Sequence, residues 1–278
     1  MEFNWWNSIL MGITAGAASI LPVSAEAHQR LLLKFLGIRQ VPVLMELFIH
    51  LAVFAALYVS SQNHILKMTR ASKLARIPKK KRKRPLDTVS LMDLSLCKTM
   101  LLPGLLVLFL YNKASAFVSN AILMATFLFV SGLILYIPQF LPSSNKDCRS
   151  LSRVEGLLMG LGGALYVIPG LSGVGTAVSV ASVCGVDRKY GVNMILLMTL
   201  GVTAGRIVLD VVNMVTGGIG LFSFAAFLCC ILAFAVAFLA AFLVIKLMRH
   251  LASETGYTGF AYYNWGMALF TFVLSLMA

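Results

Sequence analysis

Long apolar stretches separated by short polar segments make up most of the chain. A helix needs about 20 apolar residues to cross the hydrocarbon core of a bilayer. Stretches long enough to do so cover residues 43–61, 91–111, 115–137, 192–213, 219–247 and 257–277. The pattern therefore predicts an all-α polytopic membrane protein with six transmembrane helices.

Two further apolar regions are interrupted near their middle. Residues 6–37 contain the break "LPVSAEAH", and residues 156–186 contain the break "IPGLSGVG". Each half is too short to cross a bilayer, and Pro, Gly and Ser at the break disfavour one continuous helix. We expect two re-entrant helix–loop–helix hairpins, whose loops must be buried in protein or face water because lipid cannot satisfy their backbone.

The chain is predicted to form a single membrane domain over residues 1–278, because no long polar segment could build a second core. The two breaks share a pattern, since "GAASILP" and "GALYVIP" have Gly-Ala and Pro at the same spacing. With six spans, the first hairpin enters from one side and the second from the other. This indicates inverted-topology repeats, about residues 6–137 and 156–277, that meet near the midplane.

Charge is scarce and unevenly placed. Only 12% of the residues are charged and 59% are hydrophobic, yet the net charge is +13. Ten basic residues and no acidic one lie between Lys67 and Arg84. Alone, this run is typical of a nucleic-acid patch. In a polytopic chain it favours a cytoplasmic loop, residues 62–90, that touches anionic lipid, so we expect no nucleic-acid partner.

The cytoplasmic loop fixes the rest of the predicted topology. Both termini then lie outside, and most of the other basic segments fall inside, as the positive-inside rule requires. The exceptions, which this topology leaves outside, are Arg30, Lys34 and Arg39.

Ionisable residues within the apolar segments are the candidate site residues, because such groups are costly at membrane depth unless they are paired or functional. They are Glu26 and His28, Glu46 and His50, and Arg206 and Asp210. The members of each of the last two pairs are four residues apart, so they share a helical face. Arg206 and Asp210 are interpreted either as an internal ion pair or as part of a polar pocket between the hairpins.

Several segments resemble the undecaprenyl pyrophosphate phosphatase (BacA) family. They are "LPVSAEAH", "MELFIHLA", "PGLSGVGTA", "GVDRKYGVN" and "GFAYYNWGMA", in the family's order. The resemblance covers nearly the whole chain and implies the family's fold, six spans and two inverted re-entrant hairpins. It also implies a bacterial inner-membrane location and a polyprenyl (undecaprenyl) phosphate or diphosphate lipid carrier as ligand.

The resemblance and the pocket together give a set of expected site residues. The catalytic candidates are His28, which matches the family motif, and Glu26, which is an addition to it. The expected substrate-binding residues are Ser24, Ser172, Gly170, Gly175, Arg206, Glu46 and His50. No metal site is assigned, and a divalent cation (Mg²⁺ or Ca²⁺) is expected only if the protein is an active enzyme.

The chain departs from the family at residues that carry the chemistry. Ala15 and Ser19 stand where the family has two glutamates, and Ala25 replaces the second serine after Pro-Val. In the second motif Gly173 replaces the arginine and Val174 the following serine. Losing one donor to a developing oxyanion can cost about 10²–10³ in rate. The leading hypothesis is therefore a degenerate member that binds the lipid and acts in lipid-carrier transport, flipping or regulation.

Two alternatives stay open. The first is an active undecaprenyl-diphosphatase with a rearranged site, in which Glu26 and His28 rebuild the acid–base groups and Arg206 supplies the missing positive charge. The second is a transporter or structural protein for an unrelated ligand. The sequence is compatible with a homo-oligomer but does not predict one.

Overall fold

The computed structural model describes residues 4–38, 41–117, 120–142, 145–217, 223–254 and 257–276. These residues form helices and no strand, so the predicted all-α class is confirmed. The helices are α1 (Trp5–Ala18), α2 (Ala25–Leu36), α3 (Val43–Ala75), α4 (Thr88–Leu106), α5 (Tyr111–Phe117), α6 (Ala121–Tyr136), α7 (Arg153–Ala164), α8 (Gly173–Val183), α9 (Arg188–Gly217), α10 (Phe224–Glu254) and α11 (Thr258–Leu276).

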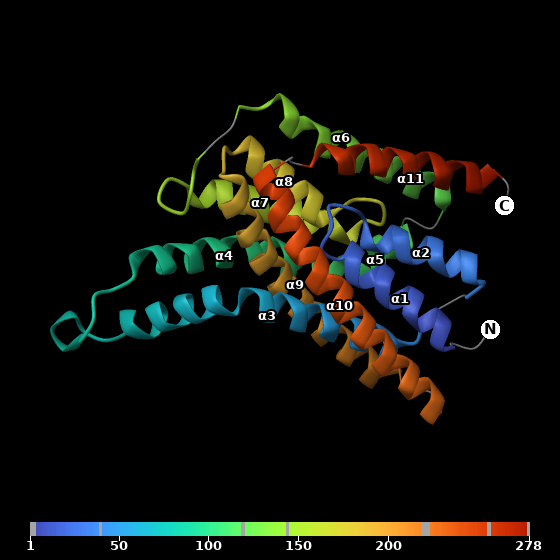
Figure 1. Cartoon of the computed structure of the whole chain (residues 1–278), viewed down its shortest axis with the longest axis horizontal. Coiled ribbons are helices and arrows are strands. Elements are labelled where there is room, and N and C mark those ends of the chain that lie inside the picture. The colour runs from blue at the N-terminus through green and yellow to red at the C-terminus, as the bar shows by residue number, and fades with distance from the viewer. Residues whose placement is uncertain are drawn as a thin grey trace.

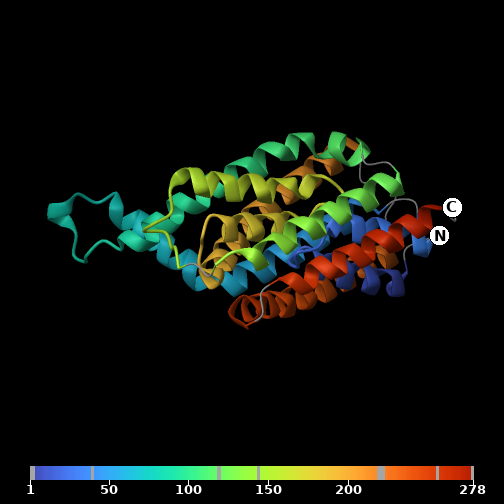
Figure 2. The ribbon, with the colours of Figure 1, turned by 90° about the horizontal axis from the view of Figure 1, so that it is seen from above.

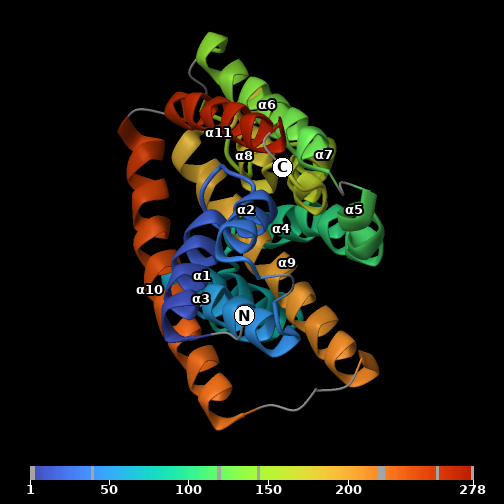
Figure 3. The same cartoon turned by 90° about the vertical axis from the view of Figure 1, so that its right-hand side faces the viewer.

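Five helical segments of the described chain are long and apolar enough to cross a membrane, which makes this a multi-pass membrane protein. They are Val43–Ala75, Thr88–Leu110, Ala121–Phe140, Arg188–Gly217 and Phe224–Ala252. The sixth predicted span is α11, a helix of 19 residues. Its mean hydropathy is lower than that of the five spans, because its first half carries Tyr262, Tyr263 and Asn264. It lies alongside α6, as Figures 1 and 3 show.

Two predicted boundaries are wrong. The span expected from residue 115 begins at Ala121, because the Asn120 side chain accepts a hydrogen bond from the Leu123 amide and caps α6. The expected loop 62–90 is helical as far as Ala75, because its Lys, Arg, Leu and Met residues are good helix formers. At 33 residues, α3 is about 50 Å long and extends beyond a hydrocarbon core of about 30 Å.

The two interrupted regions each form a pair of helices, α1 with α2 and α7 with α8. In Figure 1 the pairs come from opposite ends of the molecule and their turns meet near its centre. The turns are joined directly, since the Gly170 amide donates a 2.9 Å hydrogen bond to Ser24 Oγ. The hairpins thus exist and oppose each other, while re-entry into the bilayer stays a prediction.

Each hairpin packs its first helix against the other half of the chain. An added Cβ at Gly16 of α1 would lie 2.5 Å from the Ala237 carbonyl oxygen of α10. A Cβ at Gly160 of α7 would overlap the Met100 carbonyl oxygen of α4. Such small residues let helix backbones approach closely in a membrane. The two halves of the sequence are therefore interlocked around the hairpin turns.

The ends of the molecule agree with the predicted topology. Helix α1 begins and helix α11 ends at one end of the long axis, and the basic segment between α3 and α4 projects from the opposite end (Figures 1 and 2). That the basic end is cytoplasmic, and that the segment touches anionic lipid, remain predictions. The exception at Arg39 lies outside the described residues.

Candidate functional site

A cavity of about 120 Å³ lies between the two hairpin turns. It has room for several water molecules or a small polar head group. Its lining comes from the turn and start of α2 in the first hairpin, from the turn and start of α8 in the second, and from α3, α5 and α9. The polar lining residues include Ser19, Glu26, Gln29, His50, Tyr111, Tyr166, Thr199, Thr203 and Arg206.

The cavity lies at the positions where the chain departs from the family motifs. Ser19, Ala25, Gly173 and Val174 all line it, whereas Ala15 is fully buried beside it in α1. Both hairpins present the first residues of a helix here, because α2 begins at Ala25 and α8 at Gly173. Free amides and the helix dipole make such N-termini favourable for anions.

Arg206 of α9 provides the cation of the cavity. Its guanidinium carbon lies 3.6 Å from the centroid of the Tyr111 ring, a close cation–π contact. Its Nη1 atom is buried and has no hydrogen-bond partner among the described residues. Buried donors in native structures almost always find a partner, so an unpaired guanidinium nitrogen beside a cavity indicates a place for an anionic ligand.

Tyr111 and Arg30 hold the carboxylate of Glu26. The Tyr111 hydroxyl donates a 2.5 Å hydrogen bond to Glu26 Oε2, and Arg30 Nε donates to Oε1 at 3.1 Å. Glu26 thus lines the cavity as predicted, but both of its oxygens are already engaged. Its negative charge is balanced by Arg30 within the protein.

His50 of α3 is held by Asp210 of α9. The His50 Nδ1 and Asp210 Oδ2 atoms are 2.6 Å apart, and the Asp210 side chain is only 2% exposed. A carboxylate only accepts hydrogen bonds, so in the neutral ring Nδ1 carries the proton and Nε2 keeps its lone pair. The expected Arg206–Asp210 ion pair is not formed in the described chain, because Asp210 instead meets His50 and Arg206 lies on Tyr111.

His28 is not brought into the cavity with Glu26. Its Nδ1 lies 2.7 Å from the Ser24 carbonyl oxygen, and its Nε2 lies 2.7 Å from the Tyr263 hydroxyl of α11. Residues two apart on a helix are rotated by about 200°, so α2 turns His28 toward α11 when Glu26 faces the cavity. The shared Glu26–His28 site expected from the sequence is therefore wrong in geometry.

The motif serines and glycines build the hairpin turns. Ser24 Oγ accepts hydrogen bonds from the Ala27 and Gly170 amides, and Ser172 Oγ accepts one from the Gly175 amide. Ser24 and Ser172 cap α2 and α8 and are each 1% exposed. Gly170 has φ +105°, where a side chain is disfavoured. None of the four lines the cavity, so the structure places them as supports for it.

Glu46 lies one turn before His50 on α3, outside the cavity lining. Its amide donates to the Pro42 carbonyl oxygen, whereas its carboxylate forms no hydrogen bond or ion pair with the residues that the structure describes. Its expected substrate-binding role stays a prediction.

The arginine of the family motif cannot simply stand at position 173. A Cβ added to Gly173 would lie 2.6 Å from the Gly163 carbonyl oxygen and 2.7 Å from Tyr166 Cβ. Contacts of this length force neighbouring atoms to move, and one of the two is backbone. The cavity therefore obtains its cation from α9, through Arg206.

The described residues do not fit a divalent cation. Within the described ranges, no cluster of three or more His, Cys, Asp or Glu side chains is arranged to hold a metal ion. The carboxylate that faces the cavity, Glu26, is occupied by Arg30 and Tyr111.

Sequence reasoning missed Tyr111 and Thr199. Tyr111 begins a short helix, α5, whereas the apolar pattern placed Tyr111 at the end of the span 91–111. The sequence could have indicated Thr199, because "MELFIHLAV" (residues 45–53) and "MILLMTLGV" (residues 194–202) align without gaps. In that alignment His50 and Thr199 are equivalent, and both line the cavity from their respective halves of the chain.

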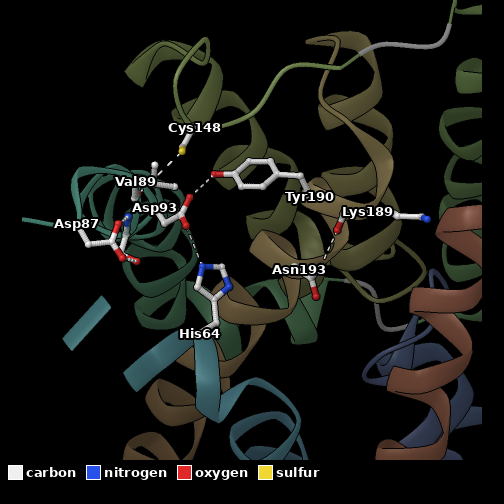
Figure 4. Close-up of polar contacts among 9 residues, drawn as sticks. His64, Asp87, Val89, Asp93, Cys148, Lys189, Tyr190 and Asn193 are labelled. Atoms are coloured by element: carbon white, nitrogen blue, oxygen red, sulfur yellow. Dashed lines mark hydrogen bonds and ion pairs between the residues drawn. The ribbon is translucent and has the colours of Figure 1, made fainter. Parts of the chain in front are cut away.

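A second polar cluster, drawn in Figure 4, joins α3, α4 and α9. His64 Nε2 of α3 is 2.9 Å from Asp93 Oδ2 of α4, and the Tyr190 hydroxyl of α9 donates to Asp93 Oδ1 at 2.7 Å. Both carboxylate oxygens are occupied by protein groups. The cluster ties three helices together and needs no ligand to do so.

Comparison with known proteins agrees with the motifs and the fold. The family model for bacitracin resistance protein BacA matches residues 8–270. An undecaprenyl-diphosphatase from Methanobrevibacter smithii is 29% identical over 274 residues, which is 97% of each chain. An undecaprenyl-diphosphatase from Carboxydothermus hydrogenoformans is 24% identical over 98% of this chain and 97% of its own. The chain belongs to the bacitracin resistance protein BacA family.

Proposed function

We propose that the cavity binds the diphosphate head group of a polyprenyl diphosphate lipid and that the protein hydrolyses it to the monophosphate. The observation that carries this proposal is the buried, unpaired Nη1 of Arg206 beside a cavity at the family's motif positions. The relatives from Methanobrevibacter smithii and Carboxydothermus hydrogenoformans are named undecaprenyl-diphosphatases, which supports the same substrate class here.

The electrostatics of the cavity suit a diphosphate. Arg206 offers a guanidinium fork, the group best matched to phosphate oxygens. The N-termini of α2 and α8 face the same space, with Ala25 and Gly173 in the lining. A water-poor site strengthens each of these interactions relative to bulk water. The site therefore combines one cation and two helix termini where a phosphoryl group would carry its charge.

Phosphate release is the test of this function. Purified protein in proteoliposomes would be given undecaprenyl diphosphate, and inorganic phosphate would be measured over time. We expect turnover by the unmodified protein and a loss of about 10²-fold or more in Arg206→Ala, because an electrostatic donor to the transferred group is removed. Arg206→Lys should lie between the two, since an ammonium cannot form the bidentate contact.

Lys246→Ala is the matched control. Lys246 also carries its charge within an apolar helix, α10, but lies against the Phe242 ring, 4.5 Å from its centroid, and does not line the cavity. Phosphate release by Lys246→Ala should equal that of the unmodified protein. Lipid binding without any phosphate release by the unmodified protein would contradict the proposal.

A second candidate is a lipid-binding protein without hydrolysis that serves lipid-carrier transport, flipping or regulation. The specific observation in its favour is the replacement of family residues by Ala15, Ser19, Ala25 and Gly173. In that case the Arg206→Ala variant should weaken binding of the lipid, while no variant changes a phosphate signal.

A further inference from the structure

We propose that His50, oriented by Asp210, is the general base of this hydrolysis, in place of the groups that the family motifs have lost. The inference rests on the proposed function and assigns the proton transfer within the same cavity. It concerns residues of α3 and α9, outside both hairpin motifs.

The geometry of the pair carries the assignment. Asp210 fixes the His50 ring through Nδ1 at 2.6 Å, and the ring lines the cavity. Nε2 makes no hydrogen bond with the residues described, so its lone pair has no competing partner there. Arg206 precedes Asp210 by one helical turn, so α9 presents both the cation and the residue that orients the base.

Two other titratable groups of α2, Glu26 and His28, and the Tyr111 hydroxyl are engaged elsewhere, and Glu46 does not line the cavity. The Glu26 carboxylate accepts from Arg30 and from Tyr111, so the Tyr111 hydroxyl is also used. Both ring nitrogens of His28 are taken by Ser24 and Tyr263.

The hydroxyl groups of the lining are also engaged. Ser19 donates to the Ala15 carbonyl, Thr199 to that of Ile195 and Thr203 to that of Thr199. The Tyr166 hydroxyl reaches the Gly104 carbonyl oxygen at 3.4 Å. Among the described lining residues, His50 therefore offers the basic nitrogen that no protein group occupies.

The proposed step balances without a further reactant. Water gives a proton to His50 Nε2 as its oxygen forms a bond to the terminal phosphorus. The bond from that phosphorus to the bridging oxygen breaks, and the electron pair leaves with the polyprenyl monophosphate. Asp210 stabilises the imidazolium that forms, and Arg206 stabilises charge on the phosphoryl oxygens. Asp210 is a positioning residue, because it acts through the ring.

His50→Ala is the decisive variant, and His64→Ala is its matched control on the same helix. Phosphate release by His50→Ala should fall about 10²–10⁴-fold, the usual contribution of a general base, with KM nearly unchanged. Added imidazole should restore part of the rate, because the truncated side chain leaves space in the cavity. A structural role for His50 would not give that rescue. His64→Ala should keep its rate once folding is verified by gel filtration.

The outcomes separate this inference from the proposed function. If His50→Ala keeps its rate while Arg206→Ala loses it, the base assignment is overturned and the diphosphatase function stands. If the unmodified protein releases no phosphate, both are overturned. An acid-labile phosphorylated protein after rapid quenching that is absent from His50→Ala would show that His50 attacks phosphorus directly, which also overturns the role of base.

Discussion

Two histidine–aspartate pairs on α3 make an instructive comparison. His50 pairs with Asp210 at 2.6 Å, and His64 pairs with Asp93 at 2.9 Å. Both pairs join α3 to a neighbouring helix and bury their carboxylate. They differ in what surrounds them: the first lines a cavity beside Arg206, whereas the second carboxylate is completed by the Tyr190 hydroxyl. The same two side chains therefore serve different ends.

The ring nitrogen that meets the carboxylate also differs. His50 uses Nδ1, which leaves Nε2 at the tip of the ring for the cavity. His64 uses Nε2, so the nitrogen at the tip of its ring is already bound to Asp93. Whether a histidine–carboxylate pair can transfer a proton to or from a ligand thus depends on whether its second ring nitrogen faces a cavity. The pair alone is not evidence of a site.

The largest difference in phosphate release is expected when the aspartate of each pair is replaced by asparagine. Asp210→Asn should lower phosphate release about 10²-fold or more and move its acidic pH limb, because the amide favours the wrong tautomer and cannot stabilise the imidazolium. Asp93→Asn should leave the turnover of folded protein within a few-fold. Its effect should appear as a lower Tm in detergent, since removing one partner of a partly buried hydrogen bond costs about 1–3 kcal/mol. Equal turnover in the two variants would remove the distinction.

An arginine at position 173 tests whether the place of the cation matters. We expect Gly173→Arg to lower the Tm and to restore no activity to Arg206→Ala, because its Cβ would meet the Gly163 carbonyl and Tyr166. Overpacking of this kind costs about 1–3 kcal/mol. Gly173→Ala is the control, since it adds the Cβ alone and should show most of the same loss. Recovery of phosphate release in the Gly173→Arg/Arg206→Ala protein would contradict this expectation.

The smallest effect is expected at a partly exposed surface pair, in which Lys146 Nζ and Glu155 Oε1 are 2.7 Å apart. The hydrogen bond from Lys146, together with the amide and hydroxyl of Ser152, lowers the pKa of Glu155 to about 2. Because this pKa is depressed, the stabilisation is present above the ordinary glutamate pKa and is lost as the pH falls from about 4.5 toward 2. Exposed pairs contribute only about 0–1 kcal/mol.

Unfolding of Glu155→Gln and unmodified protein across pH 7 to 3 measures that contribution. The Tm of Glu155→Gln should be slightly below that of the unmodified protein at pH 7, and this difference should narrow as the pH falls. A gap that widens in acid would show that Glu155 is held by something other than these partners. The result also sets the scale against which the two buried histidine pairs are judged.

The apolar pattern by itself determined the membrane class, the approximate positions of the spans and the two interrupted hairpins. Periodicity and helix-breaking residues are local properties, so the sequence contains them directly. The motif letters likewise identified the family, and the scarcity of charge singled out Glu26, His50 and Arg206, which do line the cavity. The end of α3 was missed, because a solvated helix of basic residues has no apolar signal.

Only the tertiary structure decided which side chains meet. Arg206 and Asp210 share a helical face, yet they contact different partners. With α3 and α5 packed beside α9, Asp210 binds His50 and Arg206 lies on the Tyr111 ring. Glu26 and His28 are neighbours in sequence, yet the rotation of α2 separates them. Partners that are 160 residues apart, such as His50 and Asp210, are chosen by helix packing and by the cost of burying an unpaired charge, and neither is a local property of the chain.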